Sequence, residues 1–397
     1  MKKFGFFVFL ILISCLTFPI AGEANQEQKR AMTFMDILNL KRVGSGDLSH
    51  NGQYYLCEVS SLDWKENKRY SDLYLASNQS GPLRQMTYTK KKNETSPKWH
   101  PDSAFFAFLS DRSEKNQIYF MNPDGGEPWQ VTEAKDGAIS FDWNKEGSFL
   151  AYLTGKEKER QLWILPESGD KSTELTKHET PVESWFWSPD GKRIYFIAAD
   201  RYDEIEKKRM EKGFNAQIVD PIRIPNHLWV IDLDSKKERR LTSGDDFSVE
   251  EAFISDDGQF IAFSSAPTNR YGTSIDSEVY LLELRSGKLE RLTHNQVSES
   301  SLSFSPDGKW LAFVAPDDFT YMRKERIYLY PLAGGEMIKL PEGFDLDADL
   351  SFWSEKGDTI FFSTLEGTAR NLFAVTVAKG SSPMRVTDER ASISAWK

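Results

Sequence analysis

Short runs of alternating hydrophobic and polar residues recur along most of the chain at a regular distance. A turn of the Ser-Pro-Asp-Gly type precedes each run and is clearest at residues 188–191 and 305–308. With its degenerate copies, the turn has anchor positions at 52, 103, 147, 191, 258, 308 and 357, which are 51, 44, 44, 67, 50 and 49 residues apart. The spacing predicts a repeated structural unit with one insertion.

Residues at fixed offsets from each anchor share their chemical character. Apolar residues stand four positions before the anchor and three and five positions after it. Because the side chains of a strand alternate between its two faces, offsets of three and five predict one buried face. The residues at offset five are Cys57, Phe108, Tyr152, Phe196, Phe263, Phe313 and Phe362. Cys57 occupies a position that the other copies fill with an aromatic ring, and we therefore predict that it is a core residue.

Two further strands are predicted in every copy. The first carries an aliphatic–aromatic pair: Leu73-Tyr74, Ile118-Tyr119, Leu162-Trp163, Leu228-Trp229, Val279-Tyr280, Ile327-Tyr328 and Leu372-Phe373. The next ends in an aliphatic residue followed by threonine, except in the sixth copy, which has Ile338-Lys339-Leu340. Four short antiparallel strands per repeat predict an all-β fold, a β-propeller of seven or eight four-stranded blades with WD-like, Tol-type repeats.

A short N-terminal helix is expected before the first blade. The spacing of the apolar residues Phe34, Ile37, Leu38 and Leu40 favours a helix. We assign residues 31–43 to this helix, which leads into a propeller spanning residues 44–397.

The long spacing of 67 residues marks a charged insertion at about residues 200–226. Residues 203–212 favour a helix that Gly213 ends. Two interpretations stay open: a solvated excursion, or a flap over one mouth of the propeller channel.

The last repeat is expected to be incomplete. Residues 391–397 resemble the strand that precedes each anchor, and the chain stops before the next anchor. Either this strand closes the ring against the first blade, or the sequence ends inside a repeat, which is the interpretation we favour.

The N-terminus has the pattern of an export signal. Lys2 and Lys3 precede an apolar run, and Gly22 and Ala24 supply small residues at a cleavage site. These features predict a signal peptide at residues 1–24 and a periplasmic or extracellular protein.

A second interpretation of the N-terminus gives a membrane-anchored protein. Leu12-Ile13-Ser14-Cys15 resembles a bacterial lipoprotein box, and lipidation of Cys15 would tether the chain to the membrane. The apolar run continues past Cys15, where lipoproteins normally have a polar tether. Signal cleavage is therefore favoured over lipidation.

Composition and charge restrict the partners. With 28% charged and 39% hydrophobic residues, the chain is neither disordered nor collagen-like. The net charge of −10 argues against nucleic acid as a partner. After cleavage at Ala24, Cys57 would be the one remaining cysteine, which leaves no internal disulfide.

No catalytic, cofactor-binding or metal-binding residue is predicted. The Gly-x-Ser-x-Gly pattern of serine hydrolases is absent, and its nearest approach, residues 272–276, lacks the closing glycine. Asp345, Asp347 and Asp349 begin like a calcium loop, but Leu350 stands where the loop needs glycine. Structural or surface roles are expected for the five histidines: His50, His100, His178, His227 and His294.

The repeat sequences resemble those of a known family. Residues 117–128, 188–196 and 303–313 are similar to the N-terminal β-propeller of the prolyl oligopeptidase family of serine peptidases. Within that family the acylaminoacyl-peptidase and dipeptidyl-peptidase-like branch is the most similar, and the resemblance covers about residues 31–397. The propeller of the Tol system shares the motif.

The resemblance implies a function without a catalytic site in this chain. In the family, an α/β-hydrolase domain after the propeller carries the catalytic residues, and this sequence ends before such a domain would begin. We therefore expect an exported substrate-gating propeller, truncated or split from its peptidase, that has no catalytic residues of its own. Whether the protein is an enzyme stays open. Expected partners are a peptidase catalytic domain or chain, peptides, or an envelope protein.

Two alternatives belong to other functional classes. The first is a stand-alone envelope propeller that acts as a protein-binding scaffold, as the Tol-system propeller does. The second is a propeller enzyme of another class, such as a lyase, for which the sequence lacks a histidine or carboxylate constellation.

Overall fold

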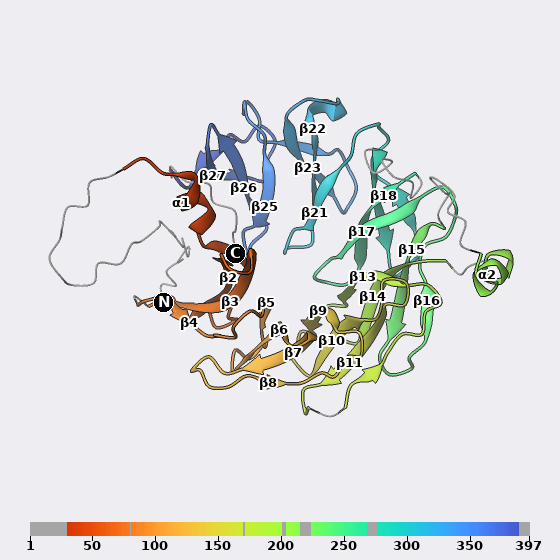
Figure 1. Ribbon diagram of the computed structural model, residues 1–397. Coiled ribbons are helices and arrows are strands. Elements are labelled where there is room, and N and C mark those ends of the chain that lie inside the picture. The colour runs from red at the N-terminus through yellow and green to blue at the C-terminus, as the bar shows by residue number, and fades with distance from the viewer. Residues whose placement is uncertain are drawn as a thin grey trace, which may run out of the picture. The chain divides into compact units, whose positions relative to one another are not determined.

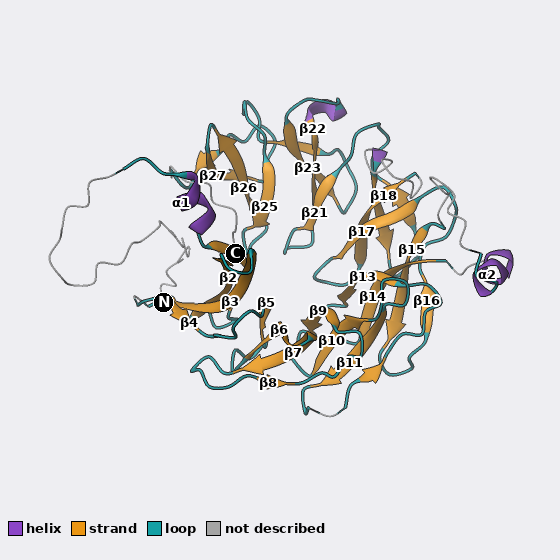
Figure 2. Ribbon diagram, viewed as in Figure 1, coloured by secondary structure: helices purple, strands orange, loops and turns teal. Residues whose placement is uncertain are grey.

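Seven four-stranded antiparallel sheets make up the structure, a computed structural model (Figures 1 and 2). The fold is a seven-bladed β-propeller, which confirms the predicted all-β class. The chain divides into two compact units, residues 1–133 with two sheets and residues 134–397 with five. The structure describes residues 30–79, 81–169, 171–200, 204–214, 224–267 and 276–388.

In the first unit, helix α1 precedes the two sheets. The bounds are α1 (Phe34–Asn39), β1 (Arg42–Leu48), β2 (Tyr54–Asp63), β3 (Lys68–Ser77) and β4 (Arg84–Gln85) for the first sheet, and β5 (Glu94–Trp99), β6 (Phe106–Ser113), β7 (Lys115–Met121) and β8 (Trp129–Gln130) for the second.

The second unit holds the third to seventh sheets, in each of which the strands pair in chain order. The third and fourth are β9 (Ala138–Trp143), β10 (Phe149–Thr154), β11 (Gln161–Pro166) and β12 (Thr173–Glu174), then β13 (Val182–Trp187), β14 (Arg193–Ala199), β15 (Asn226–Asp232) and β16 (Glu238–Arg240), with helix α2 (Glu204–Glu211) between β14 and β15. The fifth is β17 (Ser248–Ile254), β18 (Phe260–Ala266), β19 (Glu278–Glu283) and β20 (Leu289–Arg291). The sixth and seventh are β21 (Ser300–Phe304), β22 (Trp310–Pro316), β23 (Glu325–Pro331) and β24 (Ile338–Leu340), then β25 (Asp349–Trp353), β26 (Thr359–Glu366), β27 (Ala369–Thr376) and β28 (Met384–Arg385).

The strand register follows the sequence offsets in all seven sheets. The residue four positions before each anchor ends the first strand and pairs with the residue at offset three, as Trp187 does with Ile194. The residue at offset five pairs with the aromatic residue of the aliphatic–aromatic pair, as Phe263 does with Tyr280, whose ring is stacked 5.2 Å away. Cys57 lies opposite a tyrosine in the same place and is 2% exposed, so its predicted core position is confirmed. Cross-strand pairs of this kind stabilise each sheet and fill its core.

A buried threonine lies two residues after the fourth strand in six sheets. Its Oγ1 atom accepts a hydrogen bond from the backbone N–H of the aliphatic residue in the third strand. The six donor–acceptor pairs are Leu73–Thr87, Ile118–Thr132, Leu162–Thr176, Leu228–Thr242, Val279–Thr293 and Leu372–Thr387. The sixth sheet departs from this pattern because proline follows Leu340 at the end of β24.

Neighbouring turns lie against one another within each unit. Gly357 has a φ of +70°, and a Cβ atom added to it would lie 2.8 Å from Cγ of Asp307 in the preceding turn. Ser103 takes the anchor position of the second sheet with a φ of +63°, and its hydroxyl accepts a hydrogen bond 3.2 Å long from the backbone N–H of Asn51. The turns therefore contribute to the contact between sheets as well as connecting strands.

Helix α1 is shorter than the sequence predicts. A capping box of Thr33 and Asp36 starts it, and the chain leaves the helix at Leu40, where Arg69 donates a hydrogen bond of 2.7 Å to the backbone carbonyl. The first strand consequently begins at Arg42, two residues before the expected boundary. None of the helical residues is buried, and Phe34 is 70% exposed.

Helix α2 lies inside the predicted insertion and close to its expected bounds, and Gly213 follows it with a φ of +65°. Several predictions fall outside the described residues: the signal peptide at 1–24, the lipidation site Cys15, and the strand at 391–397. In the part of the chain that the structure describes, none of the helices has the length and apolar character needed to cross a bilayer.

Candidate functional site

One polar position recurs in the third strand of every sheet, directly before the aliphatic–aromatic pair. Its side chains are buried or half-buried at the end of the sheet where the second and third strands are connected. The residues are Asp72, Gln117, Gln161, His227, Glu278, Arg326 and Asn371. Buried polar groups need partners, and this position is where the seven otherwise similar sheets differ in chemistry.

In the fourth sheet this position is His227, whose side chain is fully buried. Its Nδ1 atom lies 3.1 Å from Oγ1 of Thr242, and its Nε2 atom lies 3.9 Å from Oδ2 of Asp200. Arg240 binds the same Asp200 oxygen at 2.7 Å. Burial, with the neighbouring arginine, lowers the pKa of His227 to about 4, so the imidazole is neutral at physiological pH.

A second buried histidine contacts the strand that leads into the insertion. Nδ1 of His178 lies 2.9 Å from Oε2 of Glu238, and Nε2 lies 3.2 Å from the backbone carbonyl of Ala199. The ring also packs edge-on against Trp229 at 4.5 Å. Carboxylate and carbonyl are both acceptors, so these contacts fix the ring at the end of β14.

We call His178, Asp200, His227, Glu238 and Arg240 the insertion anchor. Together they contact the end of β14 and the beginning of β15, the two strands between which the insertion with α2 lies. The group combines charge pairs and hydrogen bonds with packed rings, and it includes no serine or cysteine. These contacts fix the two points where the insertion joins the sheet, and the group supplies no nucleophile.

Two buried carboxyl groups, Glu278 of the fifth sheet and Glu299 directly before the sixth, share one asparagine. Oε1 of Glu278 accepts hydrogen bonds from Arg291 and from the backbone N–H of Asn295, each 2.7 Å long. The side-chain amide of Asn295 donates to Oε1 of Glu299 at 2.6 Å. The acids are only 2% and 4% exposed, and burial together with the charge of Glu278 raises the pKa of Glu299 to about 8.

The first unit holds an equivalent pair, Asp72 and Glu94. Oε1 of Glu94 accepts hydrogen bonds of 3.0 Å from Arg112 and from the hydroxyl of Ser110. Burial, and then the nearby charge of Glu94, raises the pKa of Asp72 to about 6. Neither acid pair is evident from the sequence alone, because isolated acidic residues in a charged chain are normally solvent-exposed. The signal that could have found them is a polar residue at the same position of every repeat.

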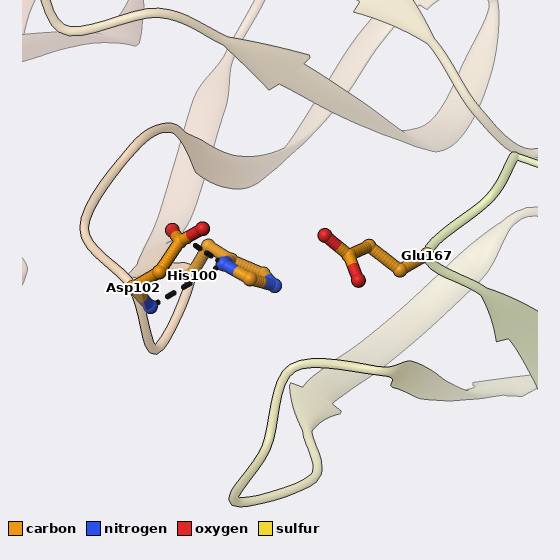
Figure 3. Close-up of side chains that lie close together, drawn as sticks. All are labelled: His100, Asp102 and Glu167. Carbon is orange, nitrogen blue, oxygen red and sulfur yellow. Dashed lines mark hydrogen bonds and ion pairs between the residues drawn. The ribbon is translucent and has the colours of Figure 1, made fainter.

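His100 lies in the turn between β5 and β6 (Figure 3). Its Nδ1 atom is 2.6 Å from Oδ1 of Asp102, which also accepts a hydrogen bond of 2.8 Å from the backbone N–H of Ala104. In this turn His100 and Ser103 stand where Ser188 and Gly191 stand in the fourth sheet, and these contacts stabilise it. His50 and His294 are exposed.

The other candidates from the sequence take separate places. Asp345 contacts Lys324, Asp347 accepts a hydrogen bond from the backbone N–H of Glu325, and Asp349 contacts Arg370. The three carboxylates thus have different partners. Burial raises the pKa of the Cys57 thiol to about 11, which makes it a poor nucleophile. Residues 272–275 of the incomplete serine-hydrolase pattern lie outside the described residues.

The fold and these sites define a β-propeller that has an insertion in its fourth sheet and two pairs of acidic residues. Comparison with known proteins shows which propeller proteins it resembles. Residues 62–208 match the family model described as the TolB beta propeller domain. Segments 225–310 and 255–325 match the model of the dipeptidyl peptidase IV N-terminal region.

Individual relatives come from the same two groups. Dipeptidyl-peptidase 5 of Porphyromonas gingivalis is 26% identical over 96% of this chain and 52% of its own length. The Tol-Pal system protein TolB of Francisella tularensis is 32% identical over 27% of this chain and 22% of its own length. Among solved structures, dipeptidyl peptidase 4 of Porphyromonas gingivalis covers 86% of this chain and 53% of that protein, with a TM-score of 0.59 at 12% identity.

These findings confirm the resemblance that the sequence predicts. The chain is a propeller related to the N-terminal propeller of dipeptidyl peptidases in the prolyl oligopeptidase family, and also to TolB-type propellers. It spans about half the length of dipeptidyl-peptidase 5. The described residues contain the propeller sheets and no α/β-hydrolase domain.

Proposed function

We propose that the chain is the substrate-gating propeller of an exported serine peptidase of the dipeptidyl-peptidase type, and that its residues admit peptides without cleaving them. One observation carries the proposal: the alignment with dipeptidyl-peptidase 5 takes in 96% of this chain but about half of the relative. The sequence has no Gly-x-Ser-x-Gly segment to supply a nucleophile. Catalysis is therefore assigned to an α/β-hydrolase domain or chain that works with this propeller.

The insertion of the fourth sheet is assigned the gating role. It leaves the sheet after Asp200 and returns at Asn226, and the insertion anchor fixes both points. A segment held rigidly at its ends can move as a flap while its attachment stays in place. The charged helix α2 would then meet incoming peptides.

The apolar side chains of α1 support a partner domain next to the first unit. Phe34, Met35 and Ile37 are each at least half exposed, and three large apolar side chains exposed together on one short helix favour a partner surface. We assign the α/β-hydrolase domain as the group that covers them, because the relative continues for about as long again as the matched region.

Export is part of the proposal. The N-terminal pattern of basic, apolar and small residues supports it, and the periplasm or the medium is the expected location. Lipidation of Cys15 would instead tether the protein to the membrane. Mass spectrometry of the mature N-terminus distinguishes the two, since one product begins at Asn25 and the other at a lipid-modified Cys15.

The test of gating uses a chimera in which this propeller replaces that of Porphyromonas gingivalis dipeptidyl-peptidase 5. The purified 397-residue chain alone should not hydrolyse dipeptidyl chromogenic substrates. The chimera should release dipeptides from short peptides and lose kcat/KM as peptides lengthen. Replacing residues 204–214 with a glycine–serine linker should weaken that length dependence, whereas the control K208A/R209A, which keeps the helix, should retain it.

Two results would overturn the proposal. Hydrolysis by the purified chain that a serine-directed inhibitor abolishes would show that it has a catalytic centre of its own. A length dependence that is identical with and without residues 204–214 would remove the gating role from the insertion.

A second candidate function, an envelope-protein scaffold, is favoured by the TolB beta propeller match over residues 62–208. In that case the chain should capture one envelope protein from cross-linked periplasmic extracts, and the chimera should be inactive. Recovery of a peptidase with an α/β-hydrolase domain in the same experiment would support the first candidate instead.

A further inference from the structure

The two acid pairs have the same composition at the same place in the repeat. In each pair one acid directly precedes the aliphatic–aromatic pair of the third strand: Asp72 in the first sheet and Glu278 in the fifth. The second acid belongs to the beginning of the next sheet: Glu94 opens β5, and Glu299 directly precedes β21. Each pair therefore bridges two successive sheets of one unit.

Each pair contains more negative charge than its neighbours neutralise. In the second unit, Arg291 of β20 binds Glu278, and Asn295, a neutral amide, is the partner of Glu299. The hydroxyl of Ser277 donates to Glu250 of β17, a further acid in the same sheet, and Tyr280 of β19 lies near the charge of Glu278.

The first unit repeats this balance. Arg112 of β6 binds Glu94, and the more distant Lys41 acts on Asp72. The hydroxyl of Thr87 also faces Asp72, at 3.4 Å. One arginine contacts each pair of carboxyl groups.

Three of the four carboxyl groups have an oxygen atom that is buried and has no hydrogen-bond partner among the described residues. These atoms are Oε2 of Glu94, of Glu278 and of Glu299. Burying a charged oxygen without a hydrogen-bond partner is strongly unfavourable for folding. A carboxyl group that takes up a proton avoids the cost, because the neutral acid needs less solvation.

We propose that each acid pair is a proton-binding joint between successive sheets, in which one carboxyl group keeps its proton to a higher pH than a free acid does and its ionisation weakens the contact between the sheets. The step is the release of one proton from a carboxyl group to solvent, with no change in covalent bonds. Glu299 is the proton carrier of the pair in the second unit, where it stays protonated at neutral pH, and Asp72 is the carrier of the pair in the first unit.

The direction of the pH dependence follows from the two pKa values. Glu299 has a pKa of about 8 and Asp72 of about 6 in the folded chain, both above the values of 4.5 and 3.8 for free groups. In the windows between these values the folded chain binds more protons than the unfolded chain, so folding weakens as pH rises. The stability that Asp72 contributes is lost as pH rises through about 6, and that from Glu299 as pH rises through about 8.

Urea unfolding between pH 6 and 8 tests the joint at Glu299. One proton released on unfolding raises the unfolding equilibrium constant about tenfold per pH unit. E299Q, which keeps a neutral group of similar shape, should lose this tenfold dependence. The control E355Q, at an exposed turn residue, should keep it.

A direct measurement covers the case in which E299Q does not fold. Unfolding of the wild-type chain in weakly buffered solution at pH 7 should release protons, and the count should fall by about one in any folded Glu299 variant. Equal slopes in wild type and E299Q would overturn the proposal. So would a slope that millimolar Ca²⁺ abolishes in the wild type, because the pair would then hold a cation rather than a proton.

Discussion

The hydroxyl oxygen of Thr242 accepts a hydrogen bond 3.0 Å long from the backbone N–H of Leu228, and both groups are buried. Leu228 lies in β15, and Thr242 lies two residues after the end of β16, where regular pairing between the two strands has ended. A side chain thus takes over from the backbone as acceptor at the sheet edge. Five other sheets repeat this bond, which explains why a threonine recurs in the sequence at the end of six of the seven repeats.

Removing this acceptor should destabilise the sheet that contains it. In the third sheet, Thr176→Val would leave the buried N–H of Leu162 unsatisfied, and we expect a loss of about 1–3 kcal/mol in the free energy of unfolding. Urea denaturation followed by tryptophan fluorescence measures it. Thr176→Ser keeps the hydroxyl and should lose clearly less. Equal losses would mean that the hydrogen bond contributes no more to stability than the methyl group does.

The aromatic column of the fifth sheet should be sensitive to truncation. Phe263 is fully buried and stacks on Tyr280, so Phe263→Ala should cost about 3–5 kcal/mol. Phe253, on the adjacent strand, is 40% exposed and supplies the control. Phe253→Ala should change stability by less than about 1 kcal/mol in the same thermal or urea measurement.

Two turn glycines distinguish the effect of backbone strain from the effect of contact with a neighbouring turn. Gly357 and Gly343 have φ of +70° and +68°, so alanine is strained at both. At Gly357 the added Cβ also meets Asp307, which cannot move without losing its bond from Ser305, whereas Gly343 faces open space. Gly357→Ala should therefore be the more destabilising by about 1–3 kcal/mol. Similar midpoints for both variants would show that the turns do not press on one another.

His227 should make the fourth sheet sensitive to acid. Its folded pKa of about 4 lies below the ordinary value of 6.5, so the unfolded chain binds an extra proton between these values. Its contribution is complete above pH 6.5 and is lost as pH falls to 4, on the order of 3 kcal/mol. H227Q should reduce the slope of unfolding free energy in this window. H50Q, in an exposed turn, should leave the slope as it is in the wild type.

Cys57 should be unreactive while the chain is folded. Its thiol is 2% exposed and its pKa is raised to about 11, so little thiolate forms at pH 8. In a Cys15→Ser background, where Cys57 is the one remaining thiol, a thiol-exchange reagent should modify it slowly in buffer and rapidly in urea. Rapid modification of the folded chain would show that the first sheet opens readily.

The sequence predicts the sheets well because the repeat supplies seven independent copies of each structural constraint. A single Trp or Phe is ambiguous, but Trp187, Phe304 and Trp353 share one offset, and all three end a first strand. Turn chemistry adds to this, since the serine and aspartate of the turn bond its own backbone.

The candidate sites were less accessible to sequence reasoning because they depend on burial and on distant partners. Glu278 and Glu299 are ordinary acids in the sequence, and their significance comes from sharing Asn295 inside the fold. His178, in the segment before β13, contacts Glu238, the first residue of β16, and no local motif connects the two. A comparison of equivalent positions would have marked the first of these groups, whereas the insertion anchor has no periodic signal.

The contact between neighbouring turns limits how such a protein can evolve. Gly357 fits against Asp307 because it has no side chain, while Ser103, at the equivalent position of the second sheet, uses its side chain to bind Asn51. The repeats look interchangeable in sequence, yet each turn is matched to the turn before it. Recombination that shuffled, duplicated or deleted a repeat would have to preserve these junctions, so each copy is expected to diverge together with its neighbour rather than toward a common consensus.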